Sequence, residues 1–150
     1  MKSDTEILNS KLIGEFISRF SVGDTWWMCI GEFYLEAHAI EFKEEEVISD
    51  FLKENYKEFN YSVDQEDVSK STIMAANLRK PITHIALDEL KNMTIDFENG
   101  STLQVLTNAD IVDWQWFISK SGGDPYMVDY EIACFWAGET KINKKSNLAP

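Results

Sequence analysis

The stretch Met93–Thr107, which reads "MTIDFENGSTLQVLT", carries the clearest strand pattern of the chain. Apolar residues alternate with polar ones on both sides of a turn that contains glycine: Met93, Ile95, Phe97, Leu103 and Val105. This alternation predicts two strands that each turn one face toward a core. The stretch therefore predicts a β-hairpin and, with it, an antiparallel sheet.

The length of the hairpin loop follows from the pairing of the strands. A two-residue Asn-Gly loop would place Ile95 opposite a polar side chain. A three-residue loop keeps one apolar face, either as residues 99–101 or as residues 98–100, and the second choice pairs Ile95 with Leu103. We therefore expect a three-residue loop with Gly100 at positive φ.

Further segments are rich in β-branched and aromatic residues and are bounded by turn residues, which predicts more strands. They are residues 13–20, 25–30, 33–42, 82–90, 110–120 and 126–138. The segment 33–42 is partly apolar on both faces, as expected of a central strand. In 110–120, regular alternation would place Trp114, Trp116 and Ile118 on one side.

The segment Glu41–Phe59 reads "EFKEEEVISDFLKENYKEF" and predicts the main helix of the chain, over about 43–59. Its apolar stripe has the helical period: Val47, Ile48, Phe51, Leu52, Asn55 and Phe59. Carboxylates fill its first turn, where the helix dipole favours them. We expect the stripe to pack on a face of the sheet. A second, shorter helix is predicted over 68–78, ended by Pro81.

These elements define an α+β protein: a mostly antiparallel, twisted β-sheet with one main amphipathic helix on a face. The 150 residues suit one domain that spans 1–150. The ends, residues 1–5 and 141–150, are expected to be frayed.

The net charge of −12 is concentrated in one segment. Glu32–Asp67 carries twelve acidic residues and three lysines, a net −9. This charge disfavours direct binding to nucleic-acid phosphates or to an anionic membrane, and it favours a basic protein partner.

Motifs of catalysis and cofactor binding are missing from the sequence, which has no Gly-rich phosphate loop, GxSxG, CxxC or HExxH. His38 and His84 stand far apart and are interpreted as structural or surface residues, without a metal. Cys29 and Cys134 both lie in apolar runs, which predicts two buried thiols rather than a disulfide. We therefore expect no enzyme activity, no cofactor and no metal.

Four carboxylates stand four residues apart in the predicted helix: Glu46, Asp50, Glu54 and Glu58. On one helix they would form a ridge, although like charges at this spacing repel each other. The ridge is either a solvated face, partly neutralised by Lys53 and Lys57, or a docking surface for a basic partner. In the second case Glu44 and Glu45 add to the electrostatic field.

Three tryptophans, Trp27, Trp114 and Trp116, are candidate aromatic anchors. They could also line a pocket on the sheet, which would make the protein a module that binds a small molecule or a peptide. A deep cavity would favour that module, and a filled core would favour a protein that binds a partner. An enzyme that uses carboxylates alone is a third possibility and needs two acids that converge in a cleft.

The segment "LKNMTIDFENGSTLQVLTNADIVDWQWFI" resembles the strand–turn–strand segments of bacterial immunity proteins from polymorphic and contact-dependent toxin systems. The resemblance covers about 87–118, with a vaguer match over 23–42. Such proteins are small, acidic and α+β. The resemblance implies a protein that binds a basic cognate toxin, such as a nuclease, and neutralises it by covering its cleft.

The N-terminal residues "MKSDTEILNS" lack the apolar region of a signal peptide. No apolar run approaches the roughly 18 residues that a membrane span needs. The expected compartment is the cytoplasm, and the oligomeric state stays open.

Overall fold

The computed structural model describes residues 2–61, 63–111, 113–120 and 130–143. Within these residues the elements are, in chain order, α1 (Asp4–Leu12), β1 (Ile17–Val22), β2 (Trp26–Ile30), β3 (Phe33–Ala37), β4 (Ala39–Glu41), α2 (Glu45–Asn55), the 3-10 helix η1 (Lys57–Asn60), α3 (Gln65–Ala76), β5 (Ile82–Leu87), β6 (Met93–Phe97), β7 (Thr102–Leu106), β8 (Trp114–Ser119), β9 (Tyr130–Phe135) and β10 (Glu139–Ile142).

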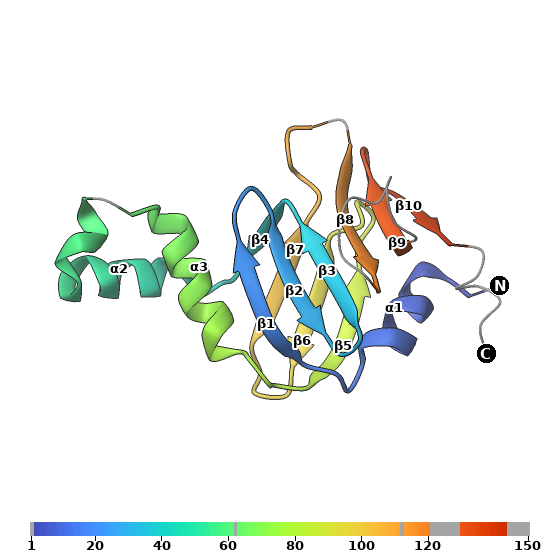
Figure 1. The fold of residues 1–150 in the computed structure, drawn as a ribbon, viewed down its shortest axis with the longest axis horizontal. Coiled ribbons are helices and arrows are strands. Elements are labelled where there is room, and N and C mark those ends of the chain that lie inside the picture. Colours follow the sequence, from blue (N-terminus) through green and yellow to red (C-terminus); the bar gives the residue numbers. More distant parts are fainter. Residues whose placement is uncertain (1, 62, 112, 121–129, 144–150) are drawn as a thin grey trace.

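The strands form two antiparallel sheets that face each other, as Figure 1 shows. One sheet has six strands in the order β1-β2-β3-β8-β9-β10, and the other has four in the order β4-β7-β6-β5. The α+β class and the antiparallel pairing predicted from the sequence are confirmed. The single sheet that we expected is instead two, and the main core lies between them.

The segment 33–42 creates the second sheet. It was expected to be one strand, but it divides at His38 into β3, which lies between β2 and β8, and β4, which pairs with β7 in the other sheet. The His38 amide donates a hydrogen bond to the Gln115 carbonyl (3.2 Å), so the corner is tied to β8. The segment is apolar on both faces because its first part, β3, belongs to one sheet and its last part, β4, belongs to the other.

The β6–β7 hairpin has the three-residue loop 98–100. Ile95 pairs with Leu103, the Phe97 amide donates to the Ser101 carbonyl (2.9 Å), and Gly100 has φ of 85°. This is the second of the two registers considered, and it turns the apolar residues of both strands into the core.

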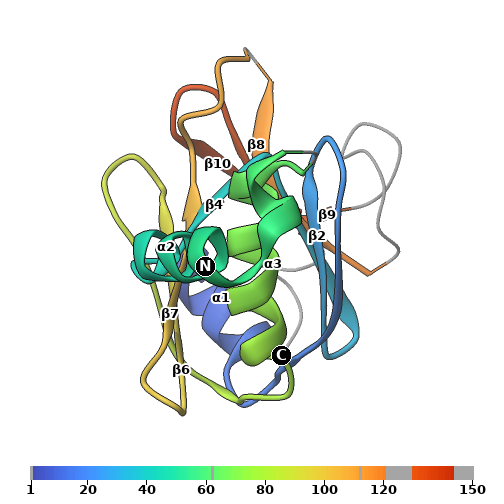
Figure 2. The ribbon, with the colours of Figure 1, turned by 90° about the vertical axis from the view of Figure 1, so that its left-hand side faces the viewer.

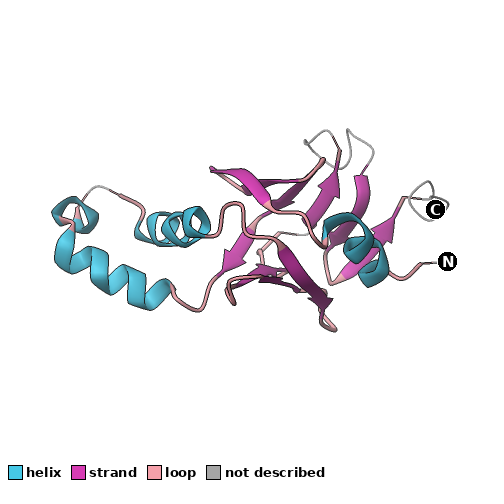
Figure 3. Cartoon of the chain, turned by 90° about the horizontal axis from the view of Figure 1, so that it is seen from below, coloured by secondary structure: helices cyan, strands magenta, loops and turns pink. Residues whose placement is uncertain are grey.

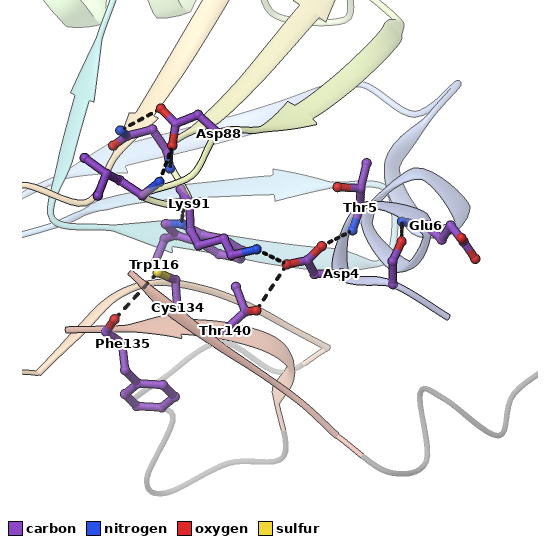
Figure 4. A network of polar contacts seen from close by, with 12 residues as sticks. Asp4, Thr5, Glu6, Asp88, Lys91, Trp116, Cys134, Phe135 and Thr140 are labelled. Carbon is purple, nitrogen blue, oxygen red and sulfur yellow. Dashed lines mark hydrogen bonds and ion pairs between the residues drawn. The ribbon is translucent and has the colours of Figure 1, made fainter. Parts of the chain in front are cut away.

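Helix α1 closes one end of the sandwich with three buried side chains, Ile7, Leu8 and Leu12. Its first residue, Asp4, accepts hydrogen bonds from Lys91 Nζ (2.8 Å) and Thr140 Oγ1 (3.1 Å), shown in Figure 4. Asp4 and Thr5 therefore belong to a helix, and residues 141–142 belong to β10, rather than to frayed ends. Residues 144–150 lie outside the described part of the chain.

Helices α2 and α3 project from the sandwich at the end opposite α1 (Figures 1 and 3). None of the residues of α2, all of which are described, is buried, and the helix packs mainly against α3 and η1. The expected packing of this helix on a sheet face is therefore wrong. We call residues 45–76 the helical hairpin; in Figure 2 it faces the viewer.

Candidate functional site

The helical hairpin is the candidate site because it combines the densest charge of the chain with exposed apolar side chains. Its second helix, α3, is the shorter helix predicted over 68–78, and it begins three residues earlier. Asp64 caps it, with Oδ1 accepting a hydrogen bond from the Asp67 amide (3.0 Å).

Helix α2 ends at Asn55, four residues before the predicted end. Tyr56 is extended (φ −127°, ψ 99°), and η1 follows, with Phe59 fully buried. The chain leaves the α-helical conformation at Tyr56, and this places the Phe59 side chain in the interior. Glu58 consequently lies on a separate turn and is not part of the predicted ridge.

The remaining carboxylates, Glu46, Asp50 and Glu54, keep the four-residue spacing on α2, and we call them the acidic row. All three are exposed. Within the described residues none of them forms an ion pair, and the expected contacts with Lys53 and Lys57 are not made. The acidic row therefore presents unneutralised charge to solvent.

Glu44 and Glu45 are half-buried and differ from the acidic row. Glu45 Oε1 lies 2.6 Å from Lys70 Nζ, and Glu45 Oε2 accepts a hydrogen bond from the Phe42 amide (2.7 Å). Glu44 Oε2 is buried and has no hydrogen-bond partner among the described residues. Glu45 therefore holds the start of α2 in place, and its charge is neutralised by Lys70 within the molecule.

Lys70 of α3 is buried and bridges the two helices. Its ammonium group contacts Glu45 and, at 3.1 Å, Glu66. Burial opposes the charged form of Lys70, but the hydrogen bonds to both carboxylates outweigh burial and raise the pKa of Lys70. The ion pairs thus fix the start of α2 against α3.

Two apolar side chains stand beside the acidic row. Val47 is 69% exposed and Phe51 is 61% exposed, whereas Ile48 and Leu52 on the inner side of α2 are half-buried. We call Val47 and Phe51 the apolar row. The helical period correctly grouped these residues, but half of the predicted core stripe faces solvent.

A groove of about 350 Å³ runs between the two helices. We call it the interhelical groove; its lining residues are Glu45, Glu46, Ser49, Gln65, Glu66 and Ser69. Sequence reasoning missed the α3 side of this groove because the register between two helices is not encoded in either one alone. The only feature of the sequence that pointed to this groove was the negative charge on both helices.

The three tryptophans do not converge. Trp116 is fully buried in the main core, where its Nε1 donates to the Lys91 carbonyl (2.9 Å). A β-bulge at Gln115 shifts the register between Trp114 and Trp116, so Trp114 joins a separate cluster with Phe117. The prediction that Trp114 and Trp116 share a face is therefore wrong.

Trp27 lies on the other face of β2 from the buried Trp26, as regular alternation predicts. It stacks on Tyr34 (ring centroids 4.5 Å apart), and the Arg19 guanidinium lies 5.3 Å from its ring centroid. Nearby residues line a second cavity of about 410 Å³: Ser18, Arg19, Cys29, Gly31, Glu32, Phe33, Tyr34 and Lys120.

The histidines and cysteines fit structural roles. Within the described ranges, no group of three or more His, Cys, Asp or Glu side chains is arranged to hold a metal ion. His38 stacks on Trp114 (4.1 Å between ring centroids), and the His84 ring is exposed beside Asp96. Both cysteines are free and buried, as predicted.

The geometry defines an α+β protein with a charged helical hairpin that extends from a β-sandwich. In the described part of the chain no helix has the length and apolar character to cross a membrane. The chain matches no protein-family model, no curated protein and no solved structure.

Proposed function

We propose that the chain is a non-catalytic protein that binds a basic protein partner through the exposed side of α2. One observation carries this proposal: the unpaired acidic row lies beside the exposed apolar row on a hairpin that projects from the sandwich. An α2 face that served only stability would turn Val47 and Phe51 inward.

The two rows supply different parts of recognition. Three carboxylates within three turns attract a cationic surface and raise the rate of encounter, with little effect on specificity. Val47 and Phe51 add apolar contact area, and burial of such area against a partner favours association. Together the rows match a partner whose basic surface contains an apolar pocket.

The partner class that we favour is a toxin domain with a basic cleft. A nuclease needs such a cleft to hold phosphates, and an acidic protein that covers the cleft excludes the substrate. The resemblance to bacterial immunity proteins and the net charge of −12 both support this partner, and the site of action would be the cytoplasm.

The test screens the products of the genes beside this one for a basic toxin domain and measures the association of such a domain with the purified full chain. The association rate constant is expected to fall at least about tenfold as ionic strength rises from about 0.05 M to about 0.5 M. The triple variant Glu46→Lys, Asp50→Lys, Glu54→Lys should lose this acceleration and should no longer protect cells from the toxin.

A matched control reverses three exposed acids outside the hairpin: Asp24, Glu89 and Glu98. This control changes the net charge by the same amount and should retain protection. An association rate constant that does not change with ionic strength would refute the proposal. Full protection of cells by the triple hairpin variant would refute it as well.

A second candidate function rests on the cavity beside Trp27. Arg19, Tyr34 and Lys120 line it, and this combination suits a small anionic molecule with a flat ring. The matching test is the tryptophan fluorescence of the full chain during titration with aromatic carboxylates such as benzoate, compared with that of a Trp27→Phe variant, because the chain has five tryptophans. Quenching that Arg19→Gln abolishes would support a small-molecule module, and unchanged fluorescence would exclude this class of ligand.

A further inference from the structure

We propose that the interhelical groove receives an arginine side chain of the basic partner. This inference rests on the proposed function and names the chemistry that would anchor the partner. The occupant is a guanidinium group, and the groups that would hold it lie on both α2 and α3.

The first argument is charge. Three carboxylates line the groove, from Glu45, Glu46 and Glu66, and one cation, Lys70, contacts two of them. Glu46 has no ion pair within the described residues, and Glu66 is 72% exposed, so both acids remain open to a cation from outside. The groove therefore keeps excess negative charge after Lys70 is counted.

The second argument is an unpartnered hydroxyl. Ser69 lines the groove and is only 2% exposed, and its Oγ has no hydrogen-bond partner among the described residues. A buried hydroxyl without a partner destabilises the folded state, because it has lost its hydrogen bonds to water. An N–H donor in the groove would restore that bond when the Ser69 hydroxyl turns toward it, and this need is independent of the acidic charge.

The third argument is position around α2. Successive residues of a helix are about 100° apart around its axis. The side of α2 next to the acidic row therefore holds the groove residues Glu45, Glu46 and Ser49. Glu46 belongs to both the groove and the acidic row. The apolar row follows on the other side of the acidic row. The groove, the acidic row and the apolar row thus form one continuous surface, so a partner that docks on α2 lies over the groove.

Arginine fits this site better than lysine does. A guanidinium group carries five N–H donors in a fixed plane and can bond carboxylate and hydroxyl oxygens at the same time. A second copy of this chain is a poor occupant, because its own acidic row would face the first one.

The experiment uses the purified full chain and N-acetyl-L-arginine amide, followed by 1H–15N NMR. The matched probe is N-acetyl-L-citrulline amide, which has nearly the same shape and no charge. The arginine probe is expected to bind with a roughly millimolar Kd and to shift the amides of Ser49, Glu66 and Ser69. The citrulline probe should bind at least about tenfold more weakly.

Variants test the lining. Ser69→Ala should weaken arginine binding about tenfold, because it removes the buried acceptor. Glu66→Gln should weaken it about threefold, whereas Glu98→Gln, with the same change of charge at an exposed site outside the helical hairpin, should leave it within about twofold. The spectrum of each variant without probe shows whether it is folded.

Equal binding of citrulline, or shifts that follow the acidic row and omit the groove, would overturn the inference. The two proposals can fail separately. If a partner associates in the expected salt-dependent way but the arginine probe does not bind in the groove, only the inference about the groove is refuted. A groove that binds the probe while the triple hairpin variant still protects cells refutes only the proposed function.

Discussion

Lys70 Nζ lies 2.6 Å from Glu45 Oε1 and joins the middle of α3 to the first residue of α2. This pair holds together two helices that project from the sandwich. It also removes one carboxylate from the surface that a partner can reach. The stability of the hairpin and its surface charge are therefore set partly by the same contact.

Replacement of Lys70 by alanine is expected to lower the free energy of unfolding by about 2 kcal/mol, because it leaves Glu45 half-buried without its cation. Urea denaturation followed by circular dichroism measures the change. Lys53→Ala, at an exposed lysine of α2 without an ion pair among the described residues, should change stability by less than about 0.5 kcal/mol. Equal losses in the two variants would contradict a structural role for the pair.

Ser69 of α3 and Asn77 at its C-terminal cap are equally buried, each 2% exposed. Among the described residues Asn77 has hydrogen-bond partners, whereas the Ser69 hydroxyl has none. Asn77 Nδ2 donates to the Ile73 carbonyl (3.0 Å), and Asn77 Oδ1 accepts from Asn99 Nδ2 (3.0 Å). Asn77→Ala should therefore cost about 2 kcal/mol, whereas Ser69→Ala should be neutral or stabilising by up to about 1 kcal/mol. Thermal melts compare the two directly, and a large loss for Ser69→Ala would mean that its hydroxyl is bonded.

The exposed apolar row should contribute little to folding. Phe51→Ser is expected to change the free energy of unfolding by less than about 0.5 kcal/mol, because the ring already contacts water. Ile48→Ala, one turn earlier and packed against the main core, should cost about 1–2 kcal/mol. Chemical denaturation checks both values, and a destabilised Phe51→Ser would show that the ring packs against protein.

The stability of the protein should decrease as the pH falls below about 6.5. Burial of His38 against Trp114 lowers its pKa from the ordinary value of 6.5, and Asp113 opposes this only partly. The unfolded chain then takes up a proton at a higher pH than the folded chain, so acid favours unfolding until the folded pKa is passed.

Unfolding free energies measured from pH 8 to pH 5 test this dependence. The His38→Gln variant should lose part of the decrease. His84→Gln controls for the removal of a histidine at an exposed site. A His38→Gln curve parallel to that of the unchanged protein would rule out His38 as the source.

The Cys134 thiol should resist labelling in the folded protein. It is fully buried, and burial raises its pKa to about 12. In a Cys29→Ser variant, which leaves Cys134 as the single cysteine, reaction with a thiol reagent at pH 8 should proceed only as fast as the protein opens. Fast labelling in the absence of denaturant would show that the strand β9 is accessible.

The sequence predicted elements that depend on local pattern. A three-residue loop, at 99–101 or 98–100, followed from apolar alternation and one glycine, and α2 followed from a helical period that needs no neighbouring element. The opposite orientation of the neighbouring residues Trp26 and Trp27 follows from strand geometry alone, although that geometry does not say which of the two is buried. Each of these features is fixed within about fifteen residues of chain.

Features that depend on distant contacts were missed. The helical period of apolar residues in α2 places Val47 and Ile48 on the same side of the helix. It does not indicate which of the two packs against another element and which faces solvent. The bulge at Gln115 arises where its side chain bonds the 109–111 backbone, through Nε2 to the Ile111 carbonyl (3.2 Å) and from the Ala109 amide to Oε1 (3.0 Å). A bulge of this kind reverses the face of Trp114, and no local propensity marks it.

Because Val47 and Phe51 on the outer side of α2 face solvent, the residues on that side are under little constraint from folding. Substitutions there can accumulate over evolutionary time without loss of the β-sandwich that carries them. A lineage could in this way exchange one recognised target for another while it inherits the same scaffold.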